Sequence, residues 1–203
     1  HGGPVKAVAV SPSGSTALSG SFDYSMMQWD VTDPARPGLV NRFTDHDGAV
    51  NAVTFVPGSK LALSGSDDGI VRLWSLETAS LLHAFEAHQH KVVGLAVSAD
   101  ARLAASASWD RTVRVYDLAD RKLLHELKGH KTEVTAVAFS PDDLQLLTGD
   151  RNGRCVLWDR ETGGEIVQLW EDDQINAAVF LPDGKTVLTA SNHHTVRAWE
   201  IPS

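Results

Sequence analysis

One sequence pattern occurs five times along this chain in the same register, and that repetition restricts the fold more than any other feature. The clearest copy, Leu61–Trp74, contains a run of small and apolar residues, the turn Asp67-Asp68-Gly69, and a β-branched segment. This pattern predicts two strands joined by a tight turn. The copies end at Trp29, Trp74, Tyr116, Trp158 and Trp199, which are 45, 42, 42 and 41 residues apart (74−29, 116−74, 158−116, 199−158). Such a period indicates stacked supersecondary units.

Each copy also contains a strand before this pair and a closing strand after the aromatic residue. The predicted first strands are Val5–Val10, Val50–Phe55, Val92–Val97, Val134–Phe139 and Ile175–Phe180. The predicted closing strands are Leu39–Phe43, Leu81–Phe85, Leu123–Leu127 and Ile166–Trp170. Four antiparallel strands per unit of about 42 residues form the blade of a β-propeller. The sequence therefore predicts an all-β fold class with repeats over residues 1–43, 46–85, 88–127, 130–170 and 172–203.

Polar residues recur at fixed offsets within the repeats. A histidine precedes the first valine by four residues at His1, His46, His88 and His130. The turn aspartate follows 22 residues later in three copies (23−1, 68−46, 110−88), and the same offset reaches Asn152 in the fourth. Since buried donors and acceptors require partners, we expect a network that joins the imidazole, the carboxylate, a strand hydroxyl and the indole N–H.

These residues resemble the WD-repeat (WD40) β-propeller family, because Gly129-His130, Trp29-Asp30 and Trp158-Asp159 match its two characteristic dipeptides. The resemblance implies a structural tetrad in each of four repeats: His1, Ser19, Asp23, Trp29; His46, Ser64, Asp68, Trp74; His88, Ser106, Asp110, Tyr116; and His130, Thr148, Asn152, Trp158. The fifth repeat departs from the pattern, with His193 at the Asp position and Glu171 or Asp172 near the His position. We expect this blade to be the least rigid.

The number of strands bears on how the ring closes. The closing strand occurs four times and the other strands five times, and the resemblance favours a ring of about seven blades. We expect residues 1–203 to form a single propeller segment of five consecutive repeats from a larger ring. The alternative is a five-bladed ring that lacks one strand and leaves a sheet edge exposed.

Composition and motifs argue against several classes of function. The net charge of −8 and the absence of a basic patch argue against nucleic-acid binding. No apolar run approaches the roughly 18 residues needed to span a bilayer. The best metal-site candidates are His88/His90 and His193/His194, but no Cys or carboxylate cluster completes a ligand set. Cys155 occupies a position that is Met or Val elsewhere, so we expect a buried apolar residue and not a nucleophile.

The candidate binding positions are those that differ between repeats. The residue before the turn aspartate is Phe22, Asp67, Trp109, Arg151 or Asn192, and it lies outside the expected tetrad. The expected network places the Asp turn and the His loop on one rim of the ring. Residues flanking the first valine, including Lys6, Asn51 and Lys91, should face that rim. The resemblance implies that this rim binds partners. The alternative for Trp109 is an aromatic–cation contact with Arg151 on a neighbouring turn.

The sequence thus predicts a non-catalytic interaction scaffold for a protein or peptide partner, with no cofactor, no bound metal, no nucleic acid and no membrane insertion. Further blades or domains of the same parent chain are additional expected partners. The alternative is an accessory or sensor module of a larger multidomain enzyme or bacterial haem protein. The single cysteine leaves the redox compartment open, and we expect a cytoplasmic location.

Overall fold

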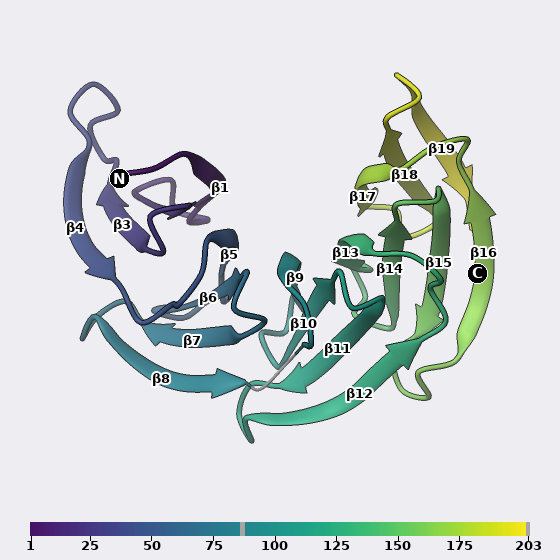
Figure 1. Ribbon diagram of the computed structural model, residues 1–203, viewed down its shortest axis with the longest axis horizontal. Helices are drawn as coiled ribbons and strands as arrows, with labels where there is room; N and C mark the ends of the chain where they lie inside the picture. The colour runs from purple at the N-terminus through teal and green to yellow at the C-terminus, as the bar shows by residue number, and fades with distance from the viewer. Residues whose placement is uncertain (86–87, 202–203) are drawn as a thin grey trace. The chain divides into compact units, whose positions relative to one another are not determined.

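The computed structural model describes residues 1–85 and 88–201, and every regular element in these residues is a β-strand. The strands form antiparallel sheets in which neighbours along the chain are hydrogen-bonded neighbours in space (Figure 1). The first two sheets have the orders β1-β2-β3-β4 and β5-β6-β7-β8. Their strands are β1 (Val5–Val10), β2 (Thr16–Ser21), β3 (Met26–Asp30), β4 (Gly38–Phe43), β5 (Val50–Phe55), β6 (Leu61–Ser66), β7 (Val71–Ser75) and β8 (Ser80–Phe85).

The third and fourth sheets have the orders β12-β11-β10-β9 and β13-β14-β15-β16, and the fifth has the three strands β17-β18-β19. Their strands are β9 (Val92–Val97), β10 (Leu103–Ser108), β11 (Thr112–Asp117), β12 (Lys122–Lys128), β13 (Val134–Phe139), β14 (Gln145–Asp150), β15 (Arg154–Asp159), β16 (Glu165–Trp170), β17 (Ile175–Phe180), β18 (Thr186–Ser191) and β19 (Val196–Glu200). The all-β prediction is confirmed, and each sheet is one blade.

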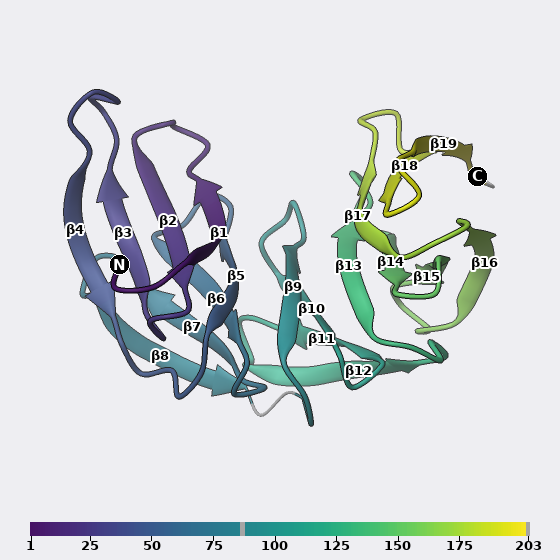
Figure 2. The same cartoon turned by 45° about the horizontal axis from the view of Figure 1, so that its top comes forward.

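The chain divides into two compact units, His1–Leu95 and Ala96–Ser203, and the division falls within β9. In the first unit β1 lies beside β5, and in the second β13 lies beside β17 (Figures 1 and 2). One propeller segment within a ring of about seven blades stays a prediction.

The cores lie between successive blades. In the first unit Leu18, Met26 and Phe43 of one blade pack with Val50 and Trp74 of the next. In the second unit Leu147 and Leu157 pack with Ile175 and Val187 in the same way. Strands covered on both sides are buried along nearly their whole length, as in β10 and β15. This double coverage explains why these strands carry apolar residues on both faces.

Small residues on the second strand allow these blades to approach closely. A Cβ atom on Gly65 would lie 2.5 Å from Val92 Cγ1, and one on Gly149 would lie 2.6 Å from Ile175 Cγ2. The third repeat has Ala107 at the corresponding position, fully buried in the cluster that includes Val134. The first strand of each following blade therefore packs against a residue with little or no side chain.

Candidate functional site

The polar network of the second blade joins all four predicted residues, His46, Ser64, Asp68 and Trp74. His46 Nδ1 lies 3.0 Å from Asp68 Oδ2, and His46 Nε2 lies 2.6 Å from Ser64 Oγ. The indole Nε1 of Trp74 donates to the same Ser64 Oγ at 2.7 Å. An ionised carboxylate only accepts, so the hydrogen bond to Asp68 places the ring proton of His46 on Nδ1. His46 Nε2 then accepts from Ser64 Oγ, which in turn accepts from the indole N–H of Trp74.

Burial and hydrogen bonding set the charges in this network. Burial lowers the pKa of His46, and the hydrogen bond with Asp68 opposes that shift only in part. Burial alone would raise the pKa of Asp68, but donors from His46, the Ile70 amide and Arg72 hold it well below its usual range. The Arg72 guanidinium, itself buried, lies 2.6 Å from Asp68 Oδ2. Asp68 is therefore an ionised carboxylate that fixes a neutral imidazole.

The first blade repeats this arrangement, with His1 Nδ1 3.0 Å from Asp23 Oδ2 and His1 Nε2 2.7 Å from Ser19 Oγ. Trp29 Nε1 donates to Ser19 Oγ at 2.7 Å. In the third blade the buried hydroxyls of Ser106 and Tyr116 lie 3.3 Å apart, and burial raises the pKa of the phenol. The Oδ1 atom of Asp110 accepts from the Thr112 amide at 2.9 Å.

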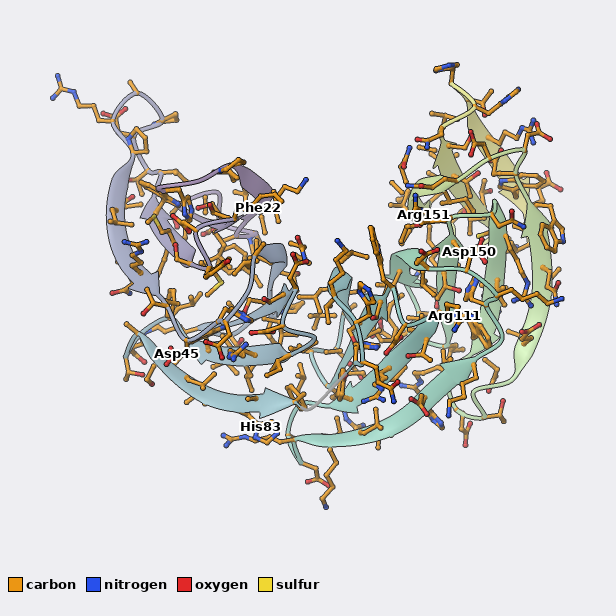
Figure 3. The ribbon with its side chains drawn as sticks, viewed as in Figure 1. Phe22, Asp45, His83, Arg111, Asp150 and Arg151 are labelled. Carbon is orange, nitrogen blue, oxygen red and sulfur yellow. The ribbon has the colours of Figure 1, made fainter. Side chains whose placement is uncertain are left out.

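The residue before each turn aspartate lies on the same rim as the network, where the backbone ties it to the start of the first strand. The amides of Phe22, Asp67, Arg151 and Asn192 donate to the carbonyls of Pro4, Ala49, Glu133 and Gln174, respectively. The side chains of Phe22, Asp67, Arg151 and Asn192 are exposed, and Figure 3 labels Phe22 and Arg151. The backbone therefore holds this position in place and leaves its side chain free to vary.

A β-bulge places a second variable side chain beside the first. The pairing of the first and second strands skips one residue in four blades, and the skipped residues are Lys6, Asn51, Thr135 and Asn176. Lys6 Nζ lies 5.2 Å from the centre of the Phe22 ring, and Asn51 Nδ2 donates to Asp67 Oδ1 at 2.8 Å. Asn176 Nδ2 likewise donates to Asn192 Oδ1 at 2.7 Å. Bulges of this kind redirect a side chain without ending the sheet.

Trp109 makes the aromatic–cation contact that the sequence left as an alternative. Its ring lies 5.2 Å from the Arg151 guanidinium carbon, and the side chain is half-buried. Arg151 Nε donates to Gln174 Oε1 at 3.1 Å, and Nη1 lies 3.5 Å from Glu133 Oε1. The guanidinium is thus fixed on three sides. Lys91, which was predicted to face this rim, precedes β9 and is half-buried.

The repeat network and the blades point to one family, and comparison with known proteins decides it. The family described as "WD domain, G-beta repeat" matches residues 1–30, 38–75, 79–117, 121–159 and 165–200. The chain belongs to the WD40 repeat family.

Several curated WD-repeat proteins are similar to part of this chain. WD repeat and SOCS box-containing protein 1 of Danio rerio is 40% identical over 62 residues, which is 30% of this chain and 15% of that protein. The human protein of the same name is 37% identical over 62 residues, which is again 30% of this chain and 15% of that protein. The WD repeat-containing protein 26 homolog of Drosophila melanogaster is 34% identical over 30% of this chain and 10% of its own length. The match therefore spans only 10–15% of these relatives.

The fourth WD40 blade corrects one predicted site residue. Asn152 is exposed, and the partner of His130 is Asp150, whose Oδ2 lies 2.7 Å from His130 Nδ1. Asp150 Oδ1 also accepts from the amides of Asn152 and Arg154, at 2.9 and 3.0 Å. One buried carboxylate thus replaces both the turn Asp and the strand Ser that stand two residues apart in other blades, such as Asp68 and Ser66. Thr148 keeps its predicted place, 2.7 Å from His130 Nε2 and 2.8 Å from Trp158 Nε1.

The fifth WD40 blade replaces the histidine with a carboxylate. Of the two predicted candidates, Glu171 accepts from Thr189 Oγ1, which in turn accepts from Trp199 Nε1 at 2.8 Å. Arg197 lies 3.2 Å from the other Glu171 oxygen and also pairs with Asp172. His193 is exposed at the turn.

Sequence reasoning missed a set of strained rim residues. The turn position after the Asp has a left-handed backbone and holds Gly69 and Gly153 in two blades, but Tyr24, Arg111 and His194 in the other three. Their φ angles are 67°, 72° and 59°, and all three side chains are exposed (Figure 3 labels Arg111). Non-glycine residues in this region cost free energy and cluster at functional sites. The sequence signal that could have identified these residues is a bulky side chain at a position that is glycine in other repeats.

Other candidate chemistry has little support in the described residues. Cys155 is buried, and burial raises the pKa of its thiol to about 12, as suits an apolar core position. Within residues 1–85 and 88–201, no three His, Cys, Asp or Glu side chains form a metal-binding group. The same residues contain no helix long and apolar enough to cross a bilayer.

Proposed function

We propose that this chain is a non-catalytic protein-interaction scaffold whose partner-binding face is the rim carrying the His loops and Asp turns. WD40 repeats generally mediate protein–protein interaction, and the segments that match this chain are parts of longer WD-repeat proteins. The finer assignment to one rim rests on the residues of each blade.

The observation that carries the proposal is the variety of chemistry at one backbone position. Phe22, Asp67, Trp109, Arg151 and Asn192 occupy equivalent turns, yet they are apolar, acidic, aromatic, basic and amide side chains. A position that serves only the fold would repeat one chemistry, as the network position does with Ser or Thr. Exposure of four of these five side chains supports the same conclusion. Strained, exposed Tyr24 and Arg111 on the same rim add to it.

The Trp109–Arg151 pair is the strongest candidate for a binding hot spot. Trp and Arg are the residue types most enriched at hot spots. The stack and the hydrogen bond to Gln174 hold Arg151 in place before a partner arrives. Binding then immobilises fewer free rotamers, which reduces its entropic cost.

The test uses a peptide selected from a displayed library with the 203-residue chain as bait. We expect Trp109→Ala to weaken peptide binding by about 2 kcal/mol, roughly 30-fold, because it removes the aromatic surface and frees Arg151. Isothermal titration calorimetry measures the change, and chemical denaturation checks that the variant stays folded.

Pro141→Ala is the matched control, because Pro141 is exposed in the turn between β13 and β14, at the opposite end of β14 from Asp150. Its affinity should equal that of the unmodified chain. Loss of binding in Pro141→Ala with full binding in Trp109→Ala would place the site on the other rim and contradict the proposal.

A further inference from the structure

The fourth blade contains a pocket beside its rearranged network. The pocket has a volume of about 210 Å³ and is lined by Gly129, Lys131, Asp150, Asn152, Arg154 and Trp170, among others. It lies where the Asp150-for-Asn152 exchange has changed the hydrogen bonding.

The backbone amide after the network histidine has a carboxylate partner in the first two blades. The amide of Gly2 donates to Asp23 Oδ2 at 2.7 Å, and the amide of Asp47 donates to Asp68 Oδ2 at 3.1 Å. Lys131 is the corresponding residue in the fourth blade. Its amide makes no hydrogen bond with any residue in the described ranges 1–85 and 88–201.

The reason lies in how Asp150 is used. Its oxygens accept from His130 Nδ1 and from the Asn152 and Arg154 amides, all within 3.0 Å. Asp150 lies two residues before the position that corresponds to Asp23 and Asp68. Its oxygens bind the histidine and the turn amides, and the Lys131 amide is left without an acceptor. The next residue, Thr132, lies outside the pocket lining, and its buried Oγ1 lacks a hydrogen-bond partner among the described residues. The Lys131 amide is therefore the unpaired donor of the pocket, and it favours a ligand that brings an acceptor.

The charge of the lining favours an anionic acceptor. Lys131 and Arg154 are cationic, and Asp150 is the one carboxylate among the lining residues, but Arg154 is already paired with Glu165, so the charge available to a ligand is the Lys131 ammonium group. Arg154, whose side chain is 9% exposed, is held by the Gly129 carbonyl at 2.6 Å and by Glu165 just outside the lining. Lys131 is exposed and forms no ion pair within the described part of the chain. Trp170, 53% exposed, adds an apolar wall suited to side-chain methylenes.

We propose that this pocket binds a carboxylate, supplied by an acidic side chain of a partner, which accepts from the Lys131 amide and pairs with the Lys131 ammonium group. The ligand carboxylate would take the role that the Asp23 and Asp68 oxygens have in the first two blades. The inference rests on the contacts of the fourth blade and their comparison with the first two blades, and it does not depend on partner binding by Trp109.

Amide NMR of the ¹⁵N-labelled 203-residue chain tests the proposal directly. The probes are N-acetylglutamate N-methylamide, its neutral isostere N-acetylglutamine N-methylamide, and succinate as a free carboxylate. We expect the glutamate probe to produce a saturable downfield shift of the Lys131 amide and to bind about tenfold more tightly than the glutamine probe. A response to succinate as strong as that to the glutamate probe would identify a small carboxylate as the ligand and overturn the side-chain assignment.

Two variants decide whether the response comes from this pocket. Asn152→Asp adds a negative charge to the lining and should abolish the shift. Gln145→Glu adds the same charge at the other end of β14 and should leave it intact. Equal binding of the two peptide probes, no shift at Lys131, or a full response in Asn152→Asp would each overturn the proposal. The amide spectrum itself shows whether each variant is folded.

Discussion

At the scale of single residues, the network depends on hydroxyl groups that both accept and donate. Ser64 accepts from Trp74 and donates to the neutral His46, whereas Thr189 accepts from Trp199 and donates to Glu171. In both blades the hydroxyl accepts from an indole N–H, and only the group that accepts from the hydroxyl differs. A carboxylate can therefore replace an imidazole there, provided that a cation such as Arg197 lies nearby.

The exchange of roles in the fourth blade leads to a stability prediction. Asp150→Ala should lower the free energy of unfolding by about 1–3 kcal/mol, because His130 and two amides lose their acceptor. Asn152→Ala should change it by less than about 0.5 kcal/mol, since that side chain is exposed. Urea denaturation of both variants and of Asp68→Ala measures the difference. Equal losses in Asp150→Ala and Asn152→Ala would contradict this reading of the network.

The second blade predicts a pH dependence. The pKa of His46 is lowered from 6.5 and that of Asp68 from 3.8, so the unfolded chain binds protons more readily than the folded one. The stabilisation is present above pH 6.5 and declines as the pH falls through the lowered His46 value, then further below 3.8. Denaturation at several pH values should show the first decline, and His46→Gln should flatten it. Stability that rises on acidification through this window would be inconsistent with a neutral His46.

At the scale of strands, the repeat predicts the fold closely and the site only in part. All five first strands have the bounds expected from the sequence, and the closing strands are extended by one or two residues. The bulges at Lys6 and Asn51 were not predicted, because they arise from backbone pairing and leave no pattern of polarity. Asn152 was assigned by counting from the histidine, and counting does not reveal that a carboxylate two residues earlier can reach the same ring.

Close packing between blades gives a further prediction. Gly65→Ala should destabilise the chain by about 1–3 kcal/mol, because the new Cβ would lie 2.5 Å from Val92 Cγ1. Gly38→Ala is the control, since a Cβ there meets no atom within 4 Å. Thermal denaturation compares the two variants. In a double-mutant cycle with Val92→Ala, the loss in Gly65→Ala/Val92→Ala should be smaller than the sum of the two single losses, and additive losses would assign the cost to some other cause.

At the scale of the whole molecule, apolar residues are exposed on the first and the fifth blades. Val8 and Val10 of β1 are 67% and 57% exposed, and Val196 of β19 is 70% exposed. Blade faces with this much apolar surface favour association. We therefore expect the 203-residue chain to self-associate as its concentration rises, as measured by light scattering. Val8→Lys and Val196→Lys should reduce it, whereas a monomer at all concentrations would favour closure within one chain.

The β-bulges also make this chain a practical template for new recognition surfaces. The bulged side chains lie outside the register that pairs the first and second strands, so mutating them leaves the ladder hydrogen bonds intact. The backbone amides of the neighbouring turn residues Phe22, Asp67, Arg151 and Asn192 donate to main-chain carbonyls, and these bonds do not depend on the side chain present. A combinatorial library limited to these two positions in each blade would thus explore binding chemistry while the folding code of the repeat stays constant.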